Sequence, residues 1–405
     1  MARTRAELPK DARITGYISL GVLAKTFPRD RLQAALAATE RTSRRQRKLP
    51  AHVVVYYVIA LALYMQVSYR EVLRCLLEGL QWIAGPTRLV KVTGKSGISQ
   101  ARTRLSWRPL QHLHDEVVRP IAVKATQGAW YRDWRLLSLD GSTLDVADTA
   151  GNVKAFGRPG ASRGTTAYPQ LRFVSLVENG THVLVGSQLG RYRDGETTLA
   201  TKVVAALGPG MLCLADRQFF GRDLWAQARG TGADLLWRVK KNTRLPCLEQ
   251  WPDGSYRSVI YSSERHRRHG THGLAVRVIE YTLAGVDAED LYRLVTTLVE
   301  ADHAPAPELA ALYHERWEIA TALDELKTHL RGAKIVLRSK TPDLVRQEFY
   351  GFLLAHFAIR GLMHEAALTV DADPDRLSYV HAVRVIRRKL PLAVAIPPSG
   401  ASGLP

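Results

Sequence analysis

The chain of 405 residues is long enough to bury a large core and to divide into roughly two or three structural units. Its 57 Lys and Arg residues against 38 Asp and Glu residues give a net charge of +19. This charge favours an anionic polymer as partner, because cations that neutralise phosphates release counterions, although a ribosome-bound or simply soluble basic protein would carry it too. The three cysteines are far apart and lack CxxC spacing, which argues against a disulfide framework or a zinc site.

Secreted, membrane-spanning and nucleotide-driven proteins are also disfavoured. No apolar signal region follows the N-terminal residues 1–5, so we expect a cytoplasmic protein. The one long apolar run, from Val53 to Met65, is too short to cross a bilayer and predicts a buried helix. No P-loop or dinucleotide glycine motif follows a predicted strand.

Residues 1 to 130 are predicted to be mostly helical, with an early helix at 28–39 and a late one at 110–123. A basic segment at 41–48 would be costly to bury but easy to lay along a phosphate backbone, or it is a solvated loop. A second helix, predicted after a Ser99 cap, carries donors that suit base edges or phosphates. The candidate DNA contacts here are Arg44, Arg45, Arg47, Lys48, Gln100, Arg102 and Arg104.

From Trp134 onward the pattern changes to short β-rich runs. The predicted order β-β-β-α-β-α-β indicates an α/β layer built on a mixed sheet. Strands are predicted at 136–140, 171–177, 181–187, 211–216 and 233–239, and helices at 197–206 and 221–229.

Two of these predicted strands end in an aspartate, Asp140 and Asp216. Carboxylates at the carboxyl ends of strands stand at the rim of a sheet, where ligands of α/β proteins gather. Each aspartate alone is consistent with the start of a turn, but two such endings favour a site. Carboxylate oxygens suit hard cations, so both residues are candidate metal ligands.

A β-rich stretch follows, with strands predicted at 256–261, 274–283 and 291–298 around a basic loop at 265–269. The loop residues Arg265, Arg267 and Arg268 are candidate DNA contacts, or they form a solvated hairpin tip. Trp237 and Trp251 are candidates for stacking on an extruded base, although an unplaced Trp is more often part of the core.

The stretch from Tyr313 to Lys327 reads Tyr-His-Glu-Arg-Trp-Glu-Ile-Ala-Thr-Ala-Leu-Asp-Glu-Leu-Lys and lacks Gly and Pro, which predicts one continuous helix. An ordinary solvated amphipathic helix would also carry charges at this spacing. The two upstream aspartates instead favour a helix that turns one polar face toward a functional site. At about 100° per residue, one arc of roughly 80° would hold Tyr313, Arg316, position 320, Asp324 and Lys327.

This spacing resembles the signature of the DDE transposases of bacterial insertion sequences, in the insertion element four-like group with Tyr-x-x-Arg-x-x-x-Glu-x-x-x-x-x-x-Lys. Tyr313, Arg316 and Lys327 match it in register. The resemblance implies an α/β, ribonuclease H-like catalytic core with a β-rich insertion, preceded by an all-helical DNA-binding domain. The expected boundaries are 1–130 for the helical domain, 131–240 and 303–370 for the two parts of the core, 241–302 for the insertion, and 371–405 for a basic helix and disordered tail.

The same resemblance implies an enzyme that binds terminal inverted repeats and catalyses strand cleavage and transfer with two Mg²⁺ ions, for which Mn²⁺ would substitute. Asp140 would touch both ions and Asp216 one, and Tyr313, Arg316 and Lys327 would hold phosphates. The implied partners are double-stranded DNA of transposon ends and target, and a second copy of the chain across paired ends. The implied location is the bacterial cytoplasm, at the nucleoid.

The family's third catalytic acid would occupy position 320, which is Ala320 here and offers no oxygen. In a regular helix Glu318 would point roughly 160° away and Asp324 would lie about 6 Å further along the axis. We therefore expect DNA binding with weak or absent cleavage, through an engineered change, natural decay, or relocation of the acid to Asp324. The alternative is a non-catalytic DNA-binding protein derived from such an enzyme, and a generic ribonuclease H-like nuclease is a third reading.

Overall fold

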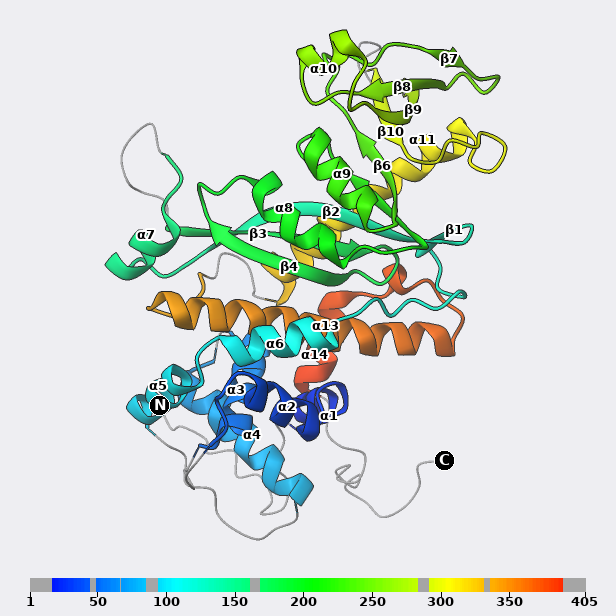
Figure 1. Cartoon of the computed structure of the whole chain (residues 1–405). Helices are drawn as coiled ribbons and strands as arrows, with labels where there is room; N and C mark the ends of the chain where they lie inside the picture. The colour runs from blue at the N-terminus through cyan, green and yellow to red at the C-terminus, as the bar shows by residue number, and fades with distance from the viewer. Residues whose placement is uncertain are drawn as a thin grey trace, which may run out of the picture.

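The computed structural model describes residues 17–43, 49–65, 67–84, 94–160, 168–282, 291–330 and 336–388 (Figure 1). A large mixed sheet forms the middle of the molecule, and the long helix α13 (Pro342–Thr369) lies between this sheet and the N-terminal helices. Helix α13 packs against α3 (Ala51–Leu63), so the N-terminal helices share one apolar core with the sheet. None of the helices in the described ranges is long and apolar enough to cross a membrane.

The N-terminal region is helical, as predicted. Helix α3 is buried from Val53 to Leu63, which confirms the buried helix predicted from the apolar run. Helix α5 begins after Gly94, so the predicted start at Ser99 is wrong and Ser99 lies inside the helix. The remaining helices are α1 (Tyr17–Thr26), α2 (Arg29–Ala38), α4 (Tyr69–Ala84), α5 (Lys95–Leu105) and α6 (Arg108–Val117), the last ending before the predicted residue 123.

The predicted β-β-β-α-β-α-β order is found with two additions: a two-residue strand precedes it, and a seven-residue helix lies between its first two strands. Strand β2 pairs antiparallel with β3 and parallel with β5, which in turn pairs parallel with β6, so the sheet is mixed. Successive residues of β2 face opposite sides: Leu137 belongs to the core shared with α13, and Leu136 to a second core on the other face. The elements are β1 (Trp130–Tyr131), β2 (Trp134–Asp145), α7 (Ala150–Phe156), β3 (Gln170–Glu178), β4 (Val183–Arg191), α8 (Glu196–Val203), η1 (Val204–Ala206), β5 (Met211–Ala215), α9 (Arg222–Gly230) and β6 (Asp234–Arg238).

The β-rich stretch between 241 and 302 extends the same sheet. Strand β10 pairs antiparallel with β6, and β9, β8 and β7 follow, so the strand order is β4-β3-β2-β5-β6-β10-β9-β8-β7. The predicted basic loop is instead the short helix α10 (Glu264–His269), because Ser263 caps its first turn and Gly270 ends it in a left-handed conformation. The strands are β7 (Glu249–Gln250), β8 (Tyr256–Ile260), β9 (Leu274–Tyr281) and β10 (Tyr292–Thr296).

The signature stretch is not one regular α-helix, which corrects the prediction. Helix α11 (Ala306–His314) passes through the 3₁₀ turn η2 (Glu315–Trp317) into α12 (Glu318–Asp324), and the six residues of η3 (Glu325–Leu330) are π-helical. These changes of winding alter which side chains share a face. Beyond α13 lie η4 (Pro374–Arg376) and α14 (Tyr379–Arg388), while the predicted tail from 396 is outside the described residues.

Candidate active site

The two aspartates lie at one point of the sheet rim, where the pairing of two adjacent strands ends. The parallel pairing of β2 with β5 ends at Leu139 opposite Ala215, and Asp140 and Asp216 are the residues that come directly after this last pair. Strand β2 itself continues to Asp145 beside β3, so the prediction that this strand ends at Asp140 is wrong. Strand β5 ends here while β2 continues, and both aspartates lie at the end of β5.

Asp140 is partly buried and surrounded by charges. Its Oδ1 accepts a hydrogen bond from the Gly141 N–H at 2.8 Å. Burial raises the pKa of Asp140, and the charge of Asp216 adds to this rise, whereas the Gly141 hydrogen bond, Arg316 and Lys327 oppose it. Asp216 accepts from the Arg217 N–H at 2.6 Å. A carboxylate that is partly desolvated beside a second carboxylate gains from a bound cation.

The signature side chains reach the same two strands. Tyr313 is buried, and its hydroxyl donates to the carbonyl of Ala215, 3.3 Å away and just before Asp216. Lys327 Nζ donates to Ser142 Oγ at 2.9 Å, two residues beyond Asp140 on β2. The Arg316 guanidinium lies 5.7 Å from the centre of the Tyr313 ring. The structure thus brings Asp140, Asp216, Tyr313, Arg316 and Lys327 together at one rim.

A third carboxylate at this rim was not anticipated from sequence. Glu196, the first residue of α8, packs so closely on Gly141 that a Cβ there would lie 2.8 Å from the Glu196 Cδ. Glu196 Oε1 lies 3.7 Å from Arg172 Nη1. Burial raises the pKa of Glu196, Arg172 lowers it and Asp140 raises it. The only sequence signal for this contact is Gly141 itself, because a larger residue there would push the Glu196 side chain away.

Position 320 lies in α12, between the 3₁₀ turn that carries Arg316 and the π-helical turn that carries Lys327. Asp324 ends α12 with an exposed side chain. Across the described residues, no group of three or more His, Cys, Asp or Glu side chains is arranged to hold a metal ion.

One of the predicted DNA contacts is wrong. Arg102 is 3% exposed, and its guanidinium donates to Gln347 Oε1 at 2.8 Å, Ser339 Oγ at 3.0 Å and the Leu344 carbonyl at 3.3 Å. Arg102 joins α5 to α13 and is not available to DNA. Gln100 and Arg104 of the same helix are exposed, and Arg44, Arg45, Arg47 and Lys48 lie outside the described residues.

In the β-rich insertion, Arg265 and Arg268 are exposed on α10. Arg267 is partly buried, and its Nη2 donates to the Arg244 carbonyl at 3.1 Å. Trp237 is fully buried and lies edge-on to Trp225 with ring centres 5.2 Å apart, so of its two readings the core one is confirmed. Trp251 remains partly accessible, with Arg277 5.6 Å from its ring centre.

Comparison with known families identifies the group of proteins to which the chain belongs. Residues 17–115 match the insertion element 4 transposase N-terminal family, and residues 132–358 match the transposase DDE domain family. The chain belongs to the insertion element 4 group of DDE transposases. The two matches lie in the order expected from the signature, and the DDE match contains Asp140, Asp216 and the whole Tyr313–Lys327 stretch.

Two relatives of this transposase come from Escherichia coli (strain K12). The transposase InsG for insertion sequence element IS4 is 25% identical over 365 residues, which are 89% of this chain and 80% of InsG. InsZ is 24% identical over 220 residues, which are 54% of this chain and 71% of InsZ. A solved structure of Aquifex aeolicus Argonaute covers 53% of this chain and 28% of its own at a TM-score of 0.19 and 11% identity, too slight a likeness to inform the fold.

Proposed function

We propose that this transposase binds the terminal inverted repeats of its insertion sequence, and that its fold is built for Mg²⁺-dependent strand cleavage and transfer. The observation that carries the proposal is the convergence of Asp140 and Asp216 with Tyr313, Arg316 and Lys327 at one rim of the sheet. Two carboxylates among three polar or cationic side chains suit a cation held against a phosphate.

The residues present fit one divalent ion better than two. The adjacent Asp140 and Asp216 would hold a Mg²⁺ ion, or Mn²⁺ in its place, and partial burial of Asp140 favours a bound cation. When bound, the metal would supply activation of the attacking oxygen and stabilisation of the leaving one. Arg316 and Lys327 would hold the scissile phosphate, and Tyr313 would fix the end of β5 against α11.

We assign a ribonuclease H-like core to the region that carries the rim. The strand order β4-β3-β2-β5-β6, in which an antiparallel trio is followed by two parallel strands, supports it. In this assignment the β-rich insertion enters after β6 and returns to α11 before the signature stretch. We propose that the chain divides into the five segments expected from its sequence, which are 1–130, 131–240, 241–302, 303–370 and 371–405.

DNA would contact both flanks of the rim. The exposed Gln100 and Arg104 of α5 would read the terminal repeat, with Arg44, Arg45, Arg47 and Lys48 on its backbone. The exposed Arg265 and Arg268 on α10 would hold the flank beside the insertion. Two copies of the chain would pair two ends in a synaptic complex at the bacterial nucleoid.

Ala320 would leave this chain impaired in cleavage, because the third carboxylate of the family signature is absent. Three explanations account for Ala320: a change made to trap uncut DNA, natural decay, and relocation of the acid to Asp324. The second candidate function, a DNA-binding protein without catalysis, is favoured by the same residue. Recovery of cleavage on restoring Glu at position 320 separates the two functions.

DNA binding itself is testable without cleavage. We expect the full chain to bind its own terminal repeat more tightly than a scrambled duplex, because direct base contacts add to the salt-sensitive phosphate contacts. Lys327→Ala should reduce the slope of log affinity against log salt concentration by about 1, the value for one phosphate contact. Fluorescence anisotropy over a salt series measures both. Equal affinity for the two duplexes, with no change of slope in the variant, would contradict the proposal.

A further inference from the structure

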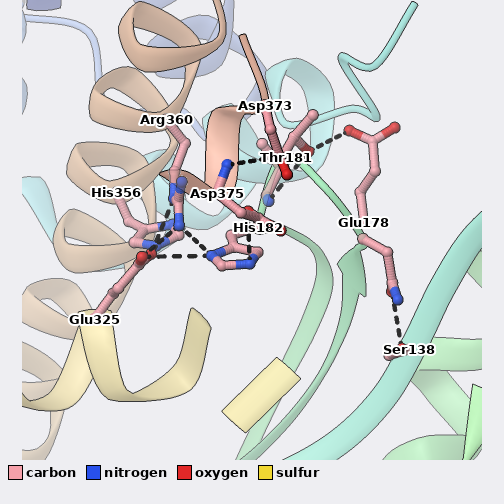
Figure 2. Close-up of polar contacts among 11 residues, drawn as sticks. Ser138, Glu178, Thr181, His182, Glu325, His356, Arg360, Asp373 and Asp375 are labelled. Atoms are coloured by element: carbon pink, nitrogen blue, oxygen red, sulfur yellow. Dashed lines mark hydrogen bonds and ion pairs between the residues drawn. The ribbon is translucent and has the colours of Figure 1, made fainter. Parts of the chain in front are cut away.

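A buried ionic cluster lies behind the signature stretch (Figure 2). Glu325, the first residue of the π-helical turn η3, is 4% exposed. Its carboxylate accepts from Arg360 Nε at 2.9 Å, contacts Arg360 Nη2, and lies 3.3 Å from His356 Nε2. It also lies 3.4 Å from His182 Nδ1. We call these four residues, with Asp375, the Glu325 cluster.

The cluster joins four segments that are far apart in the sequence. His182 belongs to the turn between β3 and β4, Glu325 to η3, Arg360 to α13 and Asp375 to η4, whose Oδ1 lies 3.0 Å from His182 Nε2. His182 has a φ of 57°, a left-handed conformation that is uncommon for residues other than glycine. The turn accepts this backbone while the imidazole reaches into the cluster (Figure 2).

Charge balance explains how the carboxylate tolerates burial. Burial alone would raise the pKa of Glu325, but the contacts with His182, His356 and Arg360 outweigh burial and lower it. For His182, burial lowers the pKa, while Asp375 and Glu325 outweigh burial and raise it. Buried ion pairs seldom stabilise a protein more than apolar side chains of equal size would, so their clearest use is to fix one geometry.

Glu325 and Lys327 lie on opposite sides of the same turn. Residues two apart on an α-helix point about 200° away from each other, and a π-helical turn changes this only modestly. Glu325 accordingly faces α13, while Lys327 reaches Ser142 Oγ on β2, two residues from Asp140. One side of the turn is fixed in the core, and the other side faces the candidate active site.

We propose that Glu325 is a positioning residue: its attachment to Arg360, His182 and His356 holds the π-helical turn in the place and orientation that aim Lys327 at the scissile phosphate. The inference rests on the proposed function, in which Lys327 binds that phosphate. Loss of the Glu325 anchor frees the whole turn to shift against α13 and β2, which moves Lys327 away from Ser142. The Lys327 side chain is then intact but no longer delivers its phosphate contact.

The test is a double-mutant cycle read as the salt dependence of DNA affinity for the full chain. Lys327→Ala and Glu325→Gln should each reduce the slope of log affinity against log salt by about 1, and the double variant should show no further reduction. The direction of the change in DNA affinity distinguishes this role from a simple charge effect. Glu325→Gln makes the chain more positive, so without a positioning role it would strengthen DNA binding. Arg360→Lys keeps the net charge and should behave as Glu325→Gln does, which covers the case in which the Gln variant does not fold.

A matched control is the buried Arg277–Asp253 ion pair of the insertion. Arg277→Lys should show no coupling with Lys327→Ala, so the effects of these two changes on the slope should add. An unchanged slope in folded Glu325→Gln and Arg360→Lys, or reductions that add to about 2 in the double variants, would overturn the positioning role alone. An unchanged slope in Lys327→Ala would overturn the phosphate role of Lys327 and the positioning role together.

Discussion

Replacing Ala320 with Glu is expected to raise Mg²⁺-dependent nicking of terminal-repeat DNA by at least about 10- to 100-fold over the present chain. Even residues that only support a metal ligand typically account for about 10- to 100-fold in metal affinity or activity, so a missing ligand should account for no less. Asp140 and Asp216 already stand at adjacent positions of the rim, and position 320 lies between the segments that carry Arg316 and Lys327. Single-turnover cleavage of an end-labelled duplex measures the gain.

Two control variants make this gain specific. Ala320→Gln fills similar space without an anionic oxygen and should leave nicking near the level of the present chain. Adding Asp140→Asn to Ala320→Glu should abolish the gain, because the restored Glu cannot replace a ligand on β2. If Ala320→Glu binds terminal-repeat DNA normally and still does not nick it, the chain is a binding protein and the catalytic assignment fails.

Replacing Arg102 with Ala is expected to lower the free energy of unfolding by about 2 to 4 kcal/mol. The change removes the guanidinium that pairs with Gln347, Ser339 and the Leu344 carbonyl, and it leaves buried polar atoms without partners. These partners belong to α13 and the segment before it, so α5 also loses part of its polar attachment to α13, while the Gln347 hydrogen bonds to the Arg102 and Ser106 carbonyls remain. Urea unfolding followed by circular dichroism measures the loss.

Arg104 is the matched control, since it is two residues away on the same helix and is exposed. Arg104→Ala should change the free energy of unfolding by no more than about 0.5 kcal/mol while weakening DNA binding. Equal stability of the two variants would show that the Arg102 contacts do not hold α5 to α13, and unchanged DNA affinity in Arg104→Ala would remove α5 from the DNA surface.

The sequence pattern predicts a helix or strand correctly where neighbouring residues alone determine it. The apolar run from Val53 marks a buried helix because no face of it is polar, and the runs before Asp140 and Asp216 mark strands that are buried on both sides. The short helix α10 was also readable, since Ser263 and Gly270 are ordinary start and stop residues, but the charge of 265–269 was interpreted as a loop.

The features that the sequence does not predict depend on residues far away in the chain. The donors of Arg102 resemble those of a DNA-reading helix, and only Gln347 and Ser339, 245 and 237 residues later, decide that it is buried. The signature stretch has uniform helical propensity, and its π-helical turn coincides with the burial of Glu325 against Arg360.

The most direct measurement is a structure of the chain bound to terminal-repeat DNA with Mn²⁺, located by its anomalous scattering. We predict Mn²⁺ bound between Asp140 and Asp216 beside a backbone phosphate, with Lys327 and Arg316 on that phosphate. Manganese bound elsewhere, or DNA that leaves these two aspartates facing only solvent, would contradict the proposed active site.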